Sequence, residues 1–188
     1  MFCERAFLGA RMSGRGAVIL SFFGSVFIAL TMYWQWNVTG IALAFPFIVF
    51  AILGSLAVYV IRLPGGGDAL SKKTQRVIVW SSMAEGLGIF IGIDIVINLH
   101  RPEWQLPVMA LVVGLHFLPI ALSASSRRFY VLGAAMIASA AVGFVVAAPA
   151  GGKIAGIAAA AILWTAACLS VAQDLRSKKV FHPAFQRP

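Results

Sequence analysis

Two acidic residues stand inside one of the most apolar stretches of this chain. Glu85 and Asp94 both fall in MAEGLGIFIGIDIVINLH, residues 83 to 100, although the whole sequence has only six aspartates and glutamates. A charged side chain at the centre of a bilayer costs about 2.5 to 3.5 kcal/mol on insertion scales. We therefore expect Glu85 to face protein or a wet cavity, or to carry a proton, and treat it as a candidate proton- or substrate-binding group.

A histidine in the next apolar stretch is the candidate partner of this carboxyl group. His116 precedes Pro119 in HFLP, and it lies at about the same depth as Glu85 if the two stretches are antiparallel helices. Pro119 cannot donate a backbone hydrogen bond to the carbonyl of Leu115, which leaves a bend or a free acceptor. The motif therefore predicts a polar notch, and contact with Glu85 depends on how the two helices are rotated about their axes.

A second pair of candidate binding residues lies nearer the end of the same stretch. Asp94 is nine residues beyond Glu85, and Asn98 follows it at the i+4 position. Two roles stay open for this pair. The residues either line an external entrance that leads toward Glu85, or solvate the following turn and pair with Arg101.

The elements that must position these residues follow from composition. The chain has 188 residues, of which 61% are hydrophobic and 11% charged, and its mean hydropathy is +0.92. Continuous apolar runs of about 20 residues predict transmembrane α-helices rather than the short alternating strands of a barrel. We predict one all-α polytopic domain over residues 1–188, with six spans at about 15–34, 40–62, 77–99, 105–125, 129–148 and 154–173.

The basic residues predict which side of the membrane each end occupies. Arg101 and Lys153 fall on one side of the six spans, and thirteen basic residues fall on the other: Arg5, Arg11, Arg15, Arg62, Lys72, Lys73, Arg76, Arg127, Arg128, Arg176, Lys178, Lys179 and Arg187. Because Lys and Arg stay preferentially on the cytoplasmic side, both termini are expected inside, in an inner (cytoplasmic) membrane. The net charge of +9 is then explained by topology and contact with lipid headgroups, and we expect no nucleic-acid partner.

Small residues predict how the spans pack. Ser81, Glu85, Gly88 and Gly92 share one helical face, and the segment GIFIG is a GxxxG packing motif. Since Asp94 adds a polar group on the opposite side, we expect the third span near the centre of the bundle. Short connections predict that successive spans are antiparallel neighbours, and the Ala- and Gly-rich fifth and sixth spans are expected to serve packing.

Other features carry less chemistry. Pro46 predicts a kink in the second span. The loop RLPGGGDALSKKTQR, residues 62 to 76, lacks the G-K-[ST] ending of a phosphate-binding loop and is expected to be a linker. Cys3 and Cys168 form no metal-binding or disulfide pattern, and neither a cofactor nor a metal is expected. Met1 and Met12 are both candidates for the native start.

Three functions fit this pattern. The first is a proton-linked transporter or permease for a small solute, with Glu85 and His116 as the protonatable centre. The second is an intramembrane enzyme acting on a lipid or isoprenoid-like substrate. The third is a noncatalytic scaffold or accessory subunit in which the pair only fixes helix register. Membrane lipid is the expected partner, and a chain of this size is compatible with a homo-oligomer.

The segment VVGLHFLPIALSASSRRFYVLGAA, residues 112 to 135, resembles the Gly-Leu-His-Phe-Leu-Pro-Leu-Ala stretch of uncharacterised small bacterial membrane proteins. The similarity extends loosely to GRGAVILSFFG near the first span. This chain has Ile120 in place of the usual Leu, and Leu122-Ser123 where a basic residue often follows. The resemblance implies a bacterial inner-membrane protein of six helices, and it implies no activity.

Overall fold

The computed structural model describes residues 14–63 and 71–181, and these form six long α-helices and two short 3-10 helices. The α-helices are α1 (Gly14–Trp36), α2 (Pro46–Arg62), α3 (Lys72–Asn98), α4 (Gln105–Ala124), α5 (Arg127–Val145) and α6 (Ala150–Phe181). The 3-10 helices η2 (Gly40–Ala44) and η3 (Pro102–Trp104) precede α2 and α4. Cys3, Met12, Arg5, Arg11, Arg187 and loop residues 64–70 lie outside the described residues.

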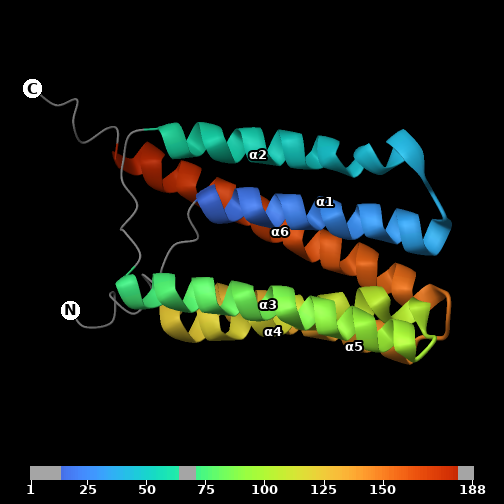
Figure 1. Ribbon diagram of the computed structural model, residues 1–188. Helices are drawn as coiled ribbons and strands as arrows, with labels where there is room; N and C mark the ends of the chain where they lie inside the picture. The colour runs from blue at the N-terminus through green and yellow to red at the C-terminus, as the bar shows by residue number, and fades with distance from the viewer. Residues whose placement is uncertain (1–13, 64–70, 182–188) are drawn as a thin grey trace, which may run out of the picture.

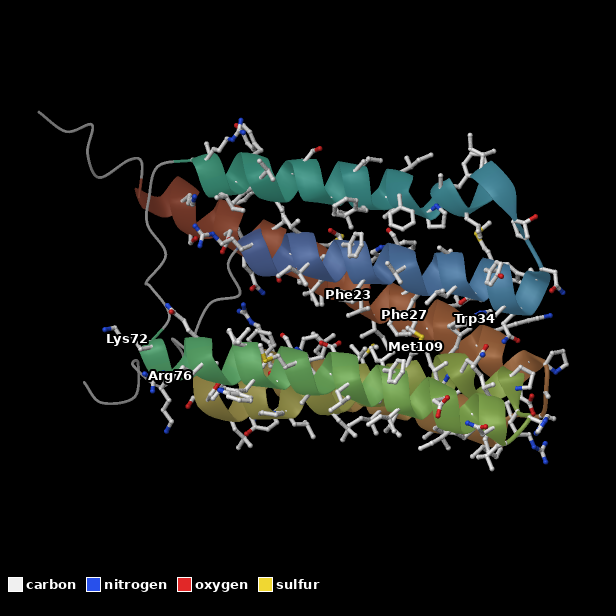
Figure 2. All side chains as sticks on the ribbon, viewed as in Figure 1. Phe23, Phe27, Trp34, Lys72, Arg76 and Met109 are labelled. Atoms are coloured by element: carbon white, nitrogen blue, oxygen red, sulfur yellow. The ribbon has the colours of Figure 1, made fainter. Side chains whose placement is uncertain are left out.

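The predicted all-α fold with six spans is confirmed. Six helical segments are long and apolar enough to cross a membrane, and each overlaps one predicted span. Successive helices joined by short connections pack side by side, as α1 with α2, α3 with α4, α4 with α5 and α5 with α6. The described basic residues Arg15, Lys72, Lys73, Arg76, Arg127 and Arg128 lie at or near helix ends on one side of the bundle, where Figure 2 labels Lys72 and Arg76.

The last helix joins two groups of helices. Figure 1 shows α1 and α2 on one side and α3, α4 and α5 on the other, with α6 running at an angle behind α1 from one group to the other. Its neighbours are α1, α5, α4 and α2. Direct packing between α1 and α4 is slight. Most of the contact between the two groups therefore passes through α6.

The core lies between α1, α4, α5 and α6. Phe27 of α1, Leu106 and Met109 of α4, Met136 of α5 and Leu163 of α6 belong to one buried cluster, in which Figure 2 labels Phe27 and Met109. In lipid, apolar side chains gain little by leaving their surroundings, so close packing rather than hydrophobic burial stabilises such a core. The fit of the side chains therefore decides which helices meet.

Small residues create that fit between α1 and α6. The Trp164 ring lies against Gly24, and its Nε1–H donates to the carbonyl of Ser21 over 3.3 Å. Further along, Gly156 faces the Thr31 hydroxyl, which itself donates to the carbonyl of Phe27 over 2.7 Å. The prediction that the Ala- and Gly-rich sixth span serves packing is therefore confirmed.

The third span does not lie near the centre of the bundle, and that prediction was wrong. Among the described helices, α3 packs mainly against α4. Of the residues in the most apolar stretch of α3, 6% are buried, against 50% for the corresponding stretch that includes α4. Trp80, Met83, Leu87 and Phe90 form an exposed apolar face on the side away from α4. The opposed polar residues misled the prediction because Asp94 is only four residues from the end of the helix, where water and headgroups are within reach.

The predicted kink at Pro46 takes another form. The chain does not run through Pro46 as one bent helix; η2 ends at Ala44, and Pro46 begins α2 as its first residue. Proline is favoured at this position because its missing N–H has no partner to lose there. The Ser25 hydroxyl of α1 donates to the carbonyl of Pro46 over 2.8 Å and holds this break against the first helix.

A lysine at the end of α6 ties that helix to the end of α2. The Lys178 ammonium donates to the carbonyl oxygen of Leu63 over 2.7 Å and also to that of Val60. Both carbonyls belong to the last turn and cap of α2, where carbonyl groups lack intrahelical partners and the helix dipole favours a cation. Lys178 therefore acts as a cap supplied by another helix.

We expect Lys178→Met to lower the free energy of unfolding by about 1.5 kcal/mol, because it removes a charged donor and keeps the aliphatic stem. Arg176→Met is the matched control, since Arg176 lies on the same helix, two residues away, and is exposed. Denaturation in detergent micelles measures both variants. Equal losses of stability would contradict the capping role.

Candidate functional site

The face of α3 that meets α4 is the predicted one. Ser81 is buried, and the glycines of GIFIG lie against valines of α4. A Cβ built on Gly88 would lie 3.0 Å from a methyl group of Val112, and one on Gly92 would lie 2.5 Å from a methyl group of Val108. The absence of side chains at these two positions therefore lets α4 approach closely enough for polar groups at mid-helix to meet.

Glu85 and His116 lie in contact across this interface. The distance from Glu85 Oε2 to His116 Nδ1 is 3.5 Å, and the two side chains are 12% and 9% exposed, respectively. Glu85 is the middle residue of α3, with thirteen residues on each side, so it lies about 20 Å from either end of the helix. The structure thus pairs a carboxyl group with an imidazole close to the expected bilayer midplane.

The pair is close enough for an ionic interaction but is not joined by a hydrogen bond. His116 Nδ1 is buried and makes no hydrogen bond to any atom of the described residues. A buried ring nitrogen without such a partner is uncommon in folded proteins. Since 3.5 Å is at the limit of hydrogen bonding, a small movement of either helix would make or break this interaction.

Aromatic packing holds the other side of the histidine. The ring of Phe117 meets that of His116 edge to face, with centroids 5.2 Å apart, and it also stacks on Phe129 of α5 at 6.2 Å. Pro119 lies inside α4, as predicted. Near the end of the interface, the hydroxyl of Thr74 approaches the carbonyl of Ser123 at 3.4 Å. This last contact was not predicted, because it depends on the relative rotation of the two helices.

Asp94 and Asn98 do not join this pair. Both are exposed, and the Asn98 amide donates to the backbone carbonyl of Asp94 over 2.9 Å. Asp94 is nine residues beyond Glu85, which places it about 13 Å further along α3 and half a turn round. The structure therefore brings Glu85 and His116 together across the α3–α4 interface, and places Asp94 and Asn98 apart from them.

The loop after α3 has its own polar contacts. Arg101 Nη1 lies 3.5 Å from Glu103 Oε1, and the guanidinium is also 5.5 Å from the centre of the Trp104 ring. Arg101 therefore pairs with its neighbour in the loop rather than with Asp94. Within residues 14–63 and 71–181, no group of three His, Cys, Asp or Glu side chains is placed to hold a metal ion. The exposed Cys168 is a free thiol.

Comparisons with family models, with curated proteins and with solved structures gave no match to this chain. The resemblance around residues 112 to 135 therefore stays a prediction. Six helices able to cross a membrane are the architecture of an integral membrane protein, and a carboxyl–imidazole pair lies at the middle of one of them.

Proposed function

We propose that this chain is a proton-linked transporter or permease for a small solute, with Glu85 and His116 as its protonation centre. The observation that carries the proposal is the 3.5 Å approach of the two side chains at the middle of α3. Intramembrane carboxyl and imidazole groups are the usual components of proton relays in pumps and transporters. Imidazole suits such a relay because its ring nitrogens can accept and release a proton.

The position of the pair gives protonation a mechanical consequence. With one proton on the pair, the two groups attract each other as an ion pair or approach as neutral groups. With two protons, His116 is cationic and Glu85 is neutral, so the imidazolium loses its counter-charge. Because α3 packs mainly on α4, this change acts on the principal interface that holds α3 in place.

The rest of that interface suits a moving helix. At Gly88 and Gly92 the backbone of α3 meets valine methyl groups of α4, and Ile78, Ile89 and Ile93 of α3 pack partly buried beside the core. Apolar contacts of this kind allow small sliding of one packed helix against another. If a proton binds more tightly when α3 occupies one of two positions on α4, protonation shifts the population of the protein toward that position. Solute movement driven by a pH gradient requires this coupling.

Proteoliposomes containing the full chain and a trapped pH-sensitive dye test the proposal. We expect an imposed pH gradient to drive proton flux above that of empty liposomes, either alone or with a panel of amino acids, sugars and organic acids. Glu85→Gln should lower this flux at least about tenfold, because a side chain without a titratable proton is left at the centre. Glu103→Gln should leave it unchanged, since that carboxylate pairs with Arg101 in the loop.

Absence of flux from the wild-type chain under all these conditions, with its fold intact, would overturn the proposal. That outcome would favour the third of the functions considered above, a noncatalytic scaffold or accessory subunit. The exposed apolar face of α3 supports this alternative, because Trp80, Leu87 and Phe90 could pack against a partner chain as readily as against lipid. The enzyme hypothesis has less support, since the two apolar grooves described below lie away from Glu85 and Asp94.

A further inference from the structure

A groove of about 490 Å³ runs between α5 and α6, away from the Glu85–His116 pair. Its lining is mostly apolar and comes from both helices, with Val131 and Leu132 from α5 and Ala161, Thr165, Leu169 and Ser170 from α6. Leu132 and Ser170 are buried in its floor, while Val131 and Leu169 stand exposed at its sides. This volume is in the range of sites that hold small ligands.

Polar groups gather at one end of the groove. Arg127, Arg128 and Gln173 line it there, and Arg128 Nη1 donates to Gln173 Oε1. Neither arginine forms an ion pair with a carboxylate of the described residues. The side-chain amide thus orients one guanidinium at the groove mouth, and within residues 14–63 and 71–181 no carboxylate neutralises the positive charge of either arginine.

The length of the groove fits one leaflet of a membrane. From Gln173 to Ala161 is twelve residues, or about 18 Å along α6, and half of a hydrocarbon core is about 15 Å. The arginines belong to the end of the bundle where basic residues gather, which the charge distribution predicts to be cytoplasmic. Cationic groups at the headgroup level above an apolar channel complement an anionic lipid with its acyl chain.

We propose that this groove binds an anionic phospholipid, with the phosphate held by Arg127 and Arg128 and one acyl chain lying between α5 and α6. Guanidinium groups suit this role because they offer paired donors to phosphate oxygens. A second groove, between α1 and α2, has a similar volume of about 450 Å³ but only one cationic side chain, Arg62. The lipid is therefore assigned to the α5–α6 groove.

Native mass spectrometry of the purified full chain tests this site, with phosphatidylglycerol and phosphatidylethanolamine of the same acyl composition as probes. We expect the wild type to retain one phosphatidylglycerol in preference to phosphatidylethanolamine. Arg127→Gln/Arg128→Gln should reduce that preference about fivefold for each arginine removed. Lys72→Gln/Lys73→Gln is the matched control, because it removes the same charge at the same end of the bundle from a helix outside the groove.

Two further variants separate the parts of the site. Thr165→Phe fills the exposed wall of the groove without changing its charge, so retention of phosphatidylglycerol should fall. Arg127→Lys/Arg128→Lys keeps the charge and should bind more weakly than the wild type but better than the glutamine pair. If Arg127→Gln/Arg128→Gln and Lys72→Gln/Lys73→Gln lose the preference for phosphatidylglycerol equally, the binding is diffuse electrostatic attraction and the proposal fails. Unchanged retention in a folded Thr165→Phe variant would likewise overturn the proposal.

Discussion

Replacement of His116 by leucine is expected to lower the free energy of unfolding by about 3 kcal/mol. The change leaves Glu85 at the middle of α3 without a counter-charge, and breaking a buried pair by removing one partner costs roughly 3 to 5 kcal/mol. The lower end of that range applies because Glu85 can take up a proton and become neutral. The loss therefore measures how much the carboxyl group depends on the imidazole 3.5 Å away.

The double variant Glu85→Leu/His116→Leu should be much less affected, with a loss of under about 1 kcal/mol. Removal of both groups leaves no uncompensated charge, and apolar replacements of buried pairs are often neutral. Unfolding of the wild type, the two single variants and the double variant in the same detergent completes a double-mutant cycle. Losses that add to within about 0.5 kcal/mol would show that the two side chains are independent.

Gly133→Val is expected to have an effect of similar size, about 3 kcal/mol, at the crossing of α4 and α5. A Cβ at Gly133 would lie 2.9 Å from the carbonyl oxygen of Gly114, and one at Gly114 would lie 3.0 Å from the carbonyl oxygen of Gly133. Each glycine thus meets the backbone of the other, which cannot rotate away as a side chain can. The two helices must separate, and overpacking of this kind costs about 1 to 3 kcal/mol.

Gly86→Val is the matched control for that crossing. Gly86 lies in α3, in the middle of a helix like Gly133, but a Cβ there would meet no atom within 4 Å. Its substitution should change the free energy of unfolding by less than about 0.5 kcal/mol. Both variants are measured by denaturation in detergent. A loss at Gly86 as large as that at Gly133 would mean that the effect arises within the helix and not at the crossing.

Much of the site could be predicted because depth in a membrane helix follows from residue number. Glu85 and His116 fall near the same level when the third and fourth spans are antiparallel, and the short connection between those spans makes them neighbours. The small residues on the Glu85 face indicated which side of the third span meets another helix, since Gly88 and Gly92 mark where a helix can approach closely. Together, depth and face named Glu85 and His116 as candidate partners, whereas their contact depends on the rotation of the two helices, which the sequence left open.

The position of α3 at the rim could not be predicted in the same way. In a soluble protein the apolar side of a helix faces the core, but in a membrane both lipid and protein interior are apolar. The exposed Trp80 and Phe90 therefore look the same in sequence as the buried Phe27 and Leu163. Which helix becomes central depends on the detailed fit of small and large side chains.

The third and sixth helices extend beyond their predicted spans for a related reason. Hydropathy marks the portion within the hydrocarbon and not the helix itself, so α6 continues past Asp174, Arg176 and Lys178 to Phe181. In the same way, α3 begins at Lys72, where the Ser71 hydroxyl accepts from the Thr74 N–H over 3.1 Å. A serine followed by a basic, helix-favouring segment was the signal for that start.

The oblique course of α6 bears on how the protein is made. Translation delivers this helix after α1 to α5, yet it supplies most of the contact between the α1–α2 hairpin and the α3–α5 group. Before α6 is inserted, the α1–α2 hairpin and the α3–α5 group thus have little direct contact with each other. The two groups of helices can therefore join only after α6 has left the ribosome and entered the bilayer.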